Sequence, residues 1–253
     1  MAVLADSMTA RKGRDRFFLI GAFLMAAVIV AGFAVNLALG RSSFGLPLIF
    51  HVHAFIFFGW VALYLTQNVL IELGSVRVHR TLGWMAVLWV PAMVAMGTAI
   101  TVYVVRMNIA PPFFDAREFL FGNPIAILCF AGLVATAIAM RRRTPWHRRL
   151  MFSAMAILTG PGFGRLLPMP FMIPWSWPIA AVAAPLLFIV AGIVADWIRL
   201  RSVHPAWLCA VAAILSTHLV SQALAFSALG ETVTREVIAG MPGANRSFAP
   251  HFP

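Results

Sequence analysis

Long apolar segments separated by short basic ones constrain this chain more than any other feature. A transmembrane helix needs about 20 largely apolar residues. Seven segments meet that length, and they cover roughly residues 17–39, 47–71, 82–105, 121–140, 149–168, 178–198 and 205–228. With 62% hydrophobic and 11% charged residues, the chain has too little polar surface to cover a water-soluble fold. We predict an all-α, polytopic membrane bundle of about seven spans, surrounded by the lipid bilayer.

The fifth segment differs from the others because it contains helix-breaking residues. Residues 159–164 read Thr-Gly-Pro-Gly-Phe-Gly. Pro161 removes a backbone donor and clashes with the preceding turn, so this segment is expected to kink or break within the membrane. The carbonyl groups freed by such a break need partners inside the protein.

The positions of the basic residues predict the orientation. Cytoplasmic loops of membrane proteins carry an excess of Lys and Arg. With the N-terminus in the cytoplasm, thirteen of the nineteen Lys and Arg residues fall in inner segments. We therefore expect a multi-pass protein of the cell inner (cytoplasmic) membrane, with its C-terminus outside. The formal net charge of +11 is confined to short segments between apolar runs, which makes a nucleic acid an improbable partner.

This orientation divides the chain into three parts. Residues 1–16 form a basic cytoplasmic tail, residues 17–228 form the transmembrane domain, and residues 229–253 form an extracytoplasmic tail. The last part is polar and contains Gly and Pro. We expect it to be disordered or to lie along the outer surface.

Polar side chains inside the spans are the first candidates for function, because they are costly in a bilayer. One set recurs along the second span at helical spacing, within about 40° of one meridian. This set consists of His53, Phe57, Trp60, Tyr64 and Gln67. On the seventh span His218 is the corresponding residue, and both His53 and His218 are expected in the outer half of the bilayer, about 9 and 15 Å deep.

A second pair of histidines is predicted at the cytoplasmic face. His79 and His147 each precede Arg at the start of a helix that runs outward. Two neutral imidazoles from different helices at matched depth are the axial ligands that a haem iron takes in a membrane bundle. Histidines at such positions are also commonly interfacial, or hydrogen-bond neighbouring helices for packing alone. The sequence leaves both interpretations open.

Other chemistries have less support. A retinal Schiff base needs a lysine within a span, and the one lysine of the chain is Lys12 in the N-terminal tail. Coupled transport usually uses carboxylates in mid-membrane, and metal hydrolysis needs a third ligand and a carboxylate base. Asp196, at the inner end of the sixth span, is the one candidate carboxylate within a helix.

Between His53 and about Arg165 the chain resembles a family of bacterial multi-span membrane proteins known as a predicted domain of unknown function. The features that carry the resemblance are, in order, His53, Gln67, Arg77, the turn His79-Arg80-x-Leu82-Gly83, His147, Met151 and Arg165. The resemblance implies a four-helix core formed by spans two to five, with the other spans around it. It implies no reaction. The arrangement is also similar in architecture to two-haem b-type cytochromes.

These observations give one leading hypothesis and two alternatives. The leading hypothesis is a protein that binds haem b and transfers electrons or faces a quinone. Its axial pair is His79 and His147, its second pair is His53 and His218, and Gln67 bonds a propionate or quinone oxygen. Trp60 and Tyr64 then line the space between the two levels.

The first alternative is a non-enzymatic accessory or assembly subunit that binds a membrane protein partner and whose histidines and Arg165 only hold helices together. The second is a passive permease or lipid-handling protein that uses the broken fifth segment. Whether the protein is an enzyme stays open at this point.

Overall fold

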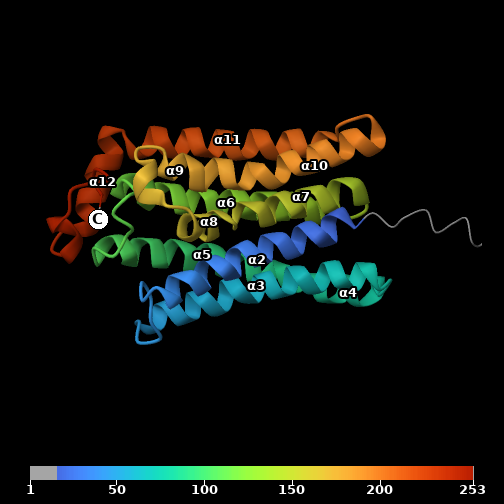
Figure 1. The fold of residues 1–253 in the computed structure, drawn as a ribbon, viewed down its shortest axis with the longest axis horizontal. Coiled ribbons are helices and arrows are strands. Elements are labelled where there is room, and N and C mark those ends of the chain that lie inside the picture. The colour runs from blue at the N-terminus through green and yellow to red at the C-terminus, as the bar shows by residue number, and fades with distance from the viewer. Residues whose placement is uncertain (1–15, 253) are drawn as a thin grey trace, which may run out of the picture.

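Residues 16–252, which the computed structural model describes, form helices that lie side by side along the long axis of the molecule (Figure 1). No strand occurs within this range, so the predicted all-α class is confirmed. The basic tail predicted for residues 1–16 lies almost wholly outside the described residues. The longer helices are α2 (Phe17–Ala38), α3 (Leu48–Glu72), α5 (Met85–Arg106), α6 (Ala116–Ala139), α7 (Thr144–Ile157), α10 (Ala184–Leu200), α11 (Pro205–Ala225) and α12 (Ala228–Ile238).

Short helical elements complete the chain. These are α4 (Val76–Gly83), α8 (Gly160–Leu166), α9 (Ser176–Pro178), the π-helical turn η2 (Ile179–Ala183), and the 3₁₀ turns η1 (Met169–Met172) and η3 (Pro242–Asn245). The elements α9, η2 and α10 follow one another directly and form one long helical segment.

Six helical segments of the described chain are long and apolar enough to cross a membrane. They are α2, α3, α5, α6, the segment Ser176–Leu200 and α11. The protein is therefore an integral membrane protein with several helical spans.

The remaining predicted span, the fifth, is split into α7 and α8. The helix α7 ends at Ile157, and α8 starts at Gly160, immediately before Pro161. Proline is well tolerated in the first turn of a helix and poorly in its interior. The break predicted from the Gly-Pro-Gly sequence is thus present, and α7 and α8 together accompany the long helices (Figure 1).

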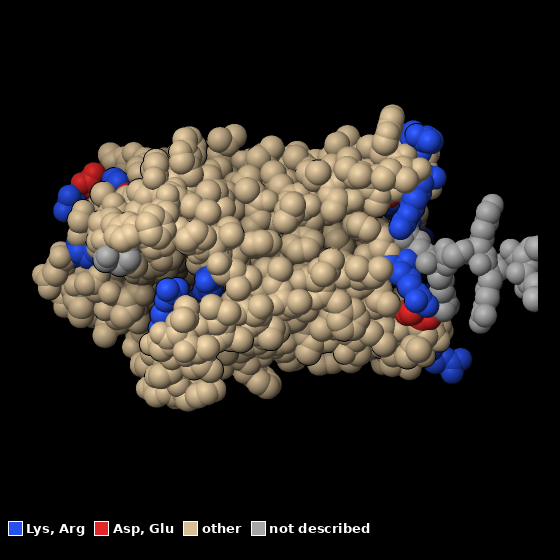
Figure 2. All heavy atoms as spheres, viewed as in Figure 1, with Lys and Arg blue, Asp and Glu red and all other residues tan. Residues whose placement is uncertain are grey.

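Charged side chains collect at the two ends of the molecule. Figure 2 shows Arg and acidic side chains at each end and an uncharged belt between them, apart from basic side chains in one hollow. The residue-16 end of α2, the α6–α7 turn and the α10–α11 turn share one end, while the described chain terminates at the other (Figure 1). Which end faces the cytoplasm stays a prediction from the distribution of basic residues.

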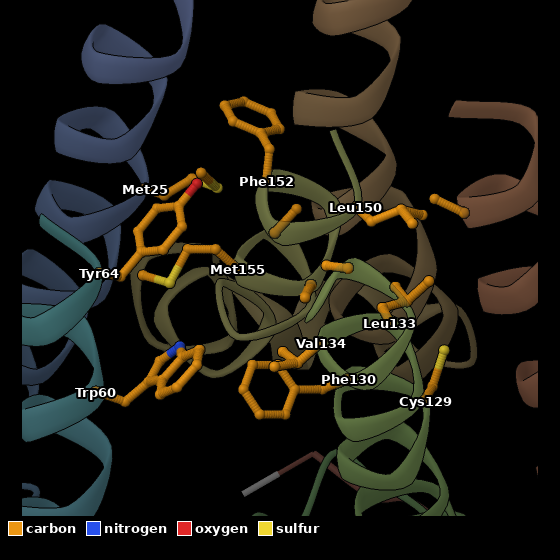
Figure 3. Packing of buried hydrophobic residues seen from close by; sticks show 14 of the residues in the cluster. Met25, Trp60, Tyr64, Cys129, Phe130, Leu133, Val134, Leu150, Phe152 and Met155 are labelled. Atoms are coloured by element: carbon orange, nitrogen blue, oxygen red, sulfur yellow. The ribbon is translucent and has the colours of Figure 1, made fainter. Parts of the chain in front are cut away.

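The hydrophobic core draws on more helices than the four expected from the resemblance. Spans two to five do pack in succession, since α3 contacts α5, α5 contacts α6, and α6 contacts α7. However, α2 contributes the fully buried Met25, and α11 contributes the fully buried Trp207. In Figure 3 Met25 lies beside Met155 of α7 and Tyr64 of α3. The first and last spans are therefore part of the core.

The C-terminal segment folds against one end of the bundle, which agrees with the second of the two predicted alternatives, a tail that lies along the surface. Ser227 caps α12 by accepting a hydrogen bond from the Gly230 N–H at 3.0 Å. Further along, the Phe248 carbonyl accepts a hydrogen bond from the Ala116 N–H at 2.9 Å. A short helix that packs on α5, α6 and α11 thus covers this end of the bundle.

Arg246 holds this segment in place. Its guanidinium donates hydrogen bonds to the carbonyl oxygens of Ala110, Pro111 and Phe114 at 2.6, 2.9 and 3.1 Å. Hydrogen bonds that involve a charged group contribute about 1.5–3 kcal/mol. We expect Arg246→Ala to open the segment locally and to speed proteolytic cleavage after residue 240 by roughly ten-fold. Limited proteolysis in detergent, with the exposed Arg41→Ala as control, checks this; equal cleavage rates would contradict it.

Candidate functional site

Two histidine rings lie next to each other at the end of the bundle that holds α4 and the start of α7. His79 lies on α4, and His147 lies on the first turn of α7. Their ring centroids are 6.3 Å apart, and their planes meet at 83°. The two helices are separated in sequence by α5 and α6, so the tertiary fold brings together the pair that the sequence placed at matched depth.

His147 is held in a single orientation by the end of α6. Its Nδ1 lies 2.8 Å from the Ala137 carbonyl oxygen. That carbonyl belongs to the last turn of α6, where backbone acceptors lack a partner within the helix. Since a carbonyl only accepts, Nδ1 carries a proton, which leaves Nε2 as the nitrogen that can offer a lone pair to a ligand. The geometry is that of a metal-binding histidine with its second nitrogen hydrogen-bonded to the protein.

Gln67 joins α3 to the second histidine. Its side-chain amide nitrogen donates to the His79 carbonyl oxygen at 3.1 Å and to His79 Nδ1, and its amide oxygen accepts from the Gly83 N–H at 3.0 Å. In this orientation both polar atoms of the amide have complementary partners. Gln67 therefore positions His79, whereas the sequence had suggested that it meets a propionate or a quinone directly.

The surroundings of His79 favour its neutral form. Burial, followed by the neighbouring His147, lowers the pKa of His79 below its ordinary value. An imidazole must be neutral to bind a metal ion. Arg77 and Arg80, on the same short helix, have exposed side chains, and Arg80 also acts on His79 electrostatically.

Trp60 and Tyr64 lie in the core and do not line an open space. Their exposed fractions are 2% and 5%. The Trp60 ring packs edge-on against Phe130 of α6 with centroids 5.2 Å apart. Figure 3 shows both aromatic side chains directed from α3 into the packed interior. Trp60 and Tyr64 therefore pack between helices. The space between the two predicted haem levels, which they were expected to line, is filled by side chains.

The structure does not bring His53 and His218 together. His53 stacks on Phe57 with ring centroids 4.3 Å apart, and its Nδ1 is buried without a hydrogen-bond partner. His218 instead lines a cavity of about 20 Å³ between α11, α6 and α9, together with Cys129 and Ser221. That volume suits one water molecule. The helices α3 and α11 belong to opposite sides of the bundle (Figure 1), so these residues form two separate polar sites.

The two histidines of the second span, His51 and His53, lie in different surroundings. His51 is exposed, and its Nε2 bonds to the Leu46 carbonyl oxygen at 3.1 Å. His53 is partly buried and faces the protein.

A buried ion pair connects three helices near the same end as His147. Arg149 is 1% exposed. It donates two hydrogen bonds to the Asp196 carboxylate of α10, at 2.8 and 2.6 Å. The same carboxylate accepts a hydrogen bond from Trp207 Nε1 of α11 at 2.8 Å. Arg149 is one of the thirteen basic residues predicted on the cytoplasmic side, and its basic character alone predicted no partner for it. The isolated carboxylate of Asp196 was the available signal, because such a group needs a cation nearby.

The glycines at the break between α7 and α8 allow neighbouring helices to pack closely. Gly162 touches the backbone of α2, where a Cβ on Gly162 would lie 2.8 Å from the Val28 carbonyl oxygen. Gly160 packs in the same way on the carbonyl of Ala180. Both glycines are buried. The permease hypothesis required these residues to expose carbonyls to a solute, and their packing gives it no support.

The fold and the polar sites together define a multi-pass, all-helical integral membrane protein with a paired-histidine site at one end. Comparison of the chain with protein-family models, with curated proteins and with solved structures finds no match. The function must therefore be argued from the site itself.

Proposed function

We propose that this protein binds haem b through His79 and His147 and transfers single electrons at the cytoplasmic side of the inner membrane. The observation that carries the proposal is the neighbouring pair of imidazoles, whose ring centroids are 6.3 Å apart and whose planes meet at 83°. A first-row metal ion binds each histidine nitrogen at about 2 Å, which places the centroids of two opposed rings about 6 Å apart.

The donor set also suits haem better than a bare metal ion. The described residues contain no group of three or more His, Cys, Asp or Glu side chains that would hold a metal. Two histidines alone leave most transition-metal ions under-coordinated. A haem would supply four nitrogen ligands from its own macrocycle, so the protein would need to supply only the remaining ligands.

The residues around the pair supply the remaining requirements. The Ala137 carbonyl fixes the ring of His147, and Gln67 fixes the ring of His79. Metal binding through Nε2 of His79 would require the ring proton to lie on Nδ1, the nitrogen beside the Gln67 amide. Arg80 and the basic segment 141–143 lie beside the two histidines in the sequence, and guanidinium groups bind carboxylates such as propionates.

Bound haem would supply reversible one-electron chemistry, and the protein would set its potential through ligands and burial. Such a site would exchange electrons with a quinone or with a membrane protein partner. The separation of His53 from His218 supports a single haem, in place of the two levels suggested by the sequence.

An accessory role without chemistry is the second candidate. The bonds from His147 to α6 and from Gln67 to α4 join different helices, and packing alone would also select them. This candidate predicts a folded protein without a chromophore.

Visible absorption spectra separate the two candidates. The protein would be expressed with adequate haem, purified in mild detergent and measured oxidised and dithionite-reduced. We expect sharp reduced-minus-oxidised α and Soret bands at stoichiometric level. His79→Ala and His147→Ala should each lose at least about 90% of this signal, because each removes one axial ligand. His51→Ala, which removes an exposed histidine elsewhere, is the matched control. Full haem content in both variants, or a featureless spectrum of folded wild-type protein, would refute the proposal.

A further inference from the structure

Arg165 is a cation in the apolar belt with no carboxylate to pair with. It lies in the last turn of α8. No Asp or Glu of residues 16–252 forms a salt bridge with it. One of its terminal nitrogens donates to the Pro161 carbonyl oxygen at 2.8 Å, and its Nε is buried without a partner. A charge without a counter-ion in such surroundings is strongly destabilising.

The neighbours of Arg165 add no negative charge. Its guanidinium lies over the ring of Phe33, 4.1 Å from the centroid. His53 of α3 is close enough for the two groups to interact electrostatically, and the His53 Nδ1 also lacks a partner. Unsatisfied nitrogen groups on α3 and α8 thus lie within electrostatic range of each other, near Phe33 of α2.

The Arg165 side chain is also accessible from the surface of the bundle. Arg165 is partly exposed, and a Cβ built on the adjacent Gly164 meets no atom within 4 Å. Figure 2 shows basic side chains in a hollow within the otherwise uncharged belt, toward the end where the chain terminates. Leu166, next to Arg165, is 39% exposed, so apolar surface borders the charged group.

We propose that Arg165, with His53 beside it, binds the phosphate of an acidic phospholipid from the leaflet nearer the C-terminal end of the bundle. The guanidinium and the imidazole supply hydrogen-bond donors, the phosphate supplies the missing negative charge, and the acyl chains stay in the lipid along the exposed apolar side chains. The site is separate from the paired histidines and does not depend on haem.

Lipid retention measured by native mass spectrometry tests this. The full-length protein would be reconstituted in vesicles of phosphatidylglycerol and phosphatidylcholine in equal amounts and then released in mild detergent. We expect wild type to retain phosphatidylglycerol selectively, and Arg165→Gln to lower this retention at least about ten-fold, since it removes one partner of a buried charge pair. Arg106→Gln, which removes a cation at the end of α5, should leave retention unchanged. Equal retention by wild type and Arg165→Gln would overturn the proposal.

Two further measurements cover the remaining outcomes. If Arg165→Gln does not fold, Arg165→Lys keeps the charge and removes the forked guanidinium; it should lower phosphatidylglycerol retention, and unchanged retention would count against the site. Inorganic phosphate added at millimolar concentration should not displace the lipid. Complete displacement by free phosphate would show that the site takes a soluble anion, which contradicts a lipid ligand.

Discussion

Asp196→Ala is expected to lower the free energy of unfolding by about 3–5 kcal/mol, because it leaves the Arg149 guanidinium buried without its carboxylate. Arg149 is 1% exposed and makes two short hydrogen bonds to Asp196. The substitution also removes the acceptor of the Trp207 indole N–H. Three helices, α7, α10 and α11, lose their shared polar contact at once.

Denaturation of the detergent-solubilised protein by SDS, followed by helical circular dichroism, measures the effect. The double variant Arg149→Met with Asp196→Leu removes both charges, so it should recover much of the lost stability, although Trp207 stays without an acceptor. Glu231→Ala is the matched control, since it removes the carboxylate of an exposed pair with Arg235 and should leave the transition unchanged. A transition of Asp196→Ala that coincides with wild type would contradict the role of this pair.

Gly162→Leu is expected to separate α8 from α2 and to lower the free energy of unfolding by about 3 kcal/mol or more. A Cβ at Gly162 would lie 2.8 Å from the Val28 carbonyl oxygen, and a Cβ at Gly32 would lie 2.5 Å from the Gly162 carbonyl oxygen. The obstacles are backbone atoms, so no side-chain rotation relieves the clash. Helices in membranes commonly approach through such small residues.

Gly164→Leu is the matched control, because it places the same side chain two residues further on α8 where no atom lies within 4 Å. SDS denaturation and gel filtration in detergent should show a destabilised or misassembled Gly162→Leu protein and a Gly164→Leu protein like wild type. If both variants behaved alike, the close contact of α2 and α8 would not contribute to stability.

The apolar segments predicted most of the secondary structure. Six of the seven long runs became continuous helical segments close to the predicted bounds, and the fifth became the two helices α7 and α8, because a bilayer leaves the helix as the simplest way to satisfy every backbone group. The third helix starts later than predicted, at Met85 in place of 82, since the residues before Trp84 form the separate helix α4. The break at Pro161 was also predictable, because proline acts on its own turn.

The candidate site was predictable only in part. The sequence placed His79 and His147 at one level, since both precede Arg at the start of a helix. It could not show that their rings lie next to each other, because helix rotation depends on neighbouring helices. Gln67 was selected as polar and on the right face, but its contact with α4 requires knowing how α4 turns back on α3.

The sequence by itself determined that this is a helical membrane protein, where its spans begin and end, and where its fifth segment breaks. These properties depend on residues close together in the chain, namely apolar length, proline position and local charge. The tertiary structure alone decided that Arg149 pairs with Asp196, that Gly162 meets Gly32, that Arg165 pairs with no carboxylate of residues 16–252 and that the C-terminal segment covers one end. The physical reason is that each of these depends on the pairing of helices distant in sequence, and hydropathy and spacing carry no information about which helix faces which.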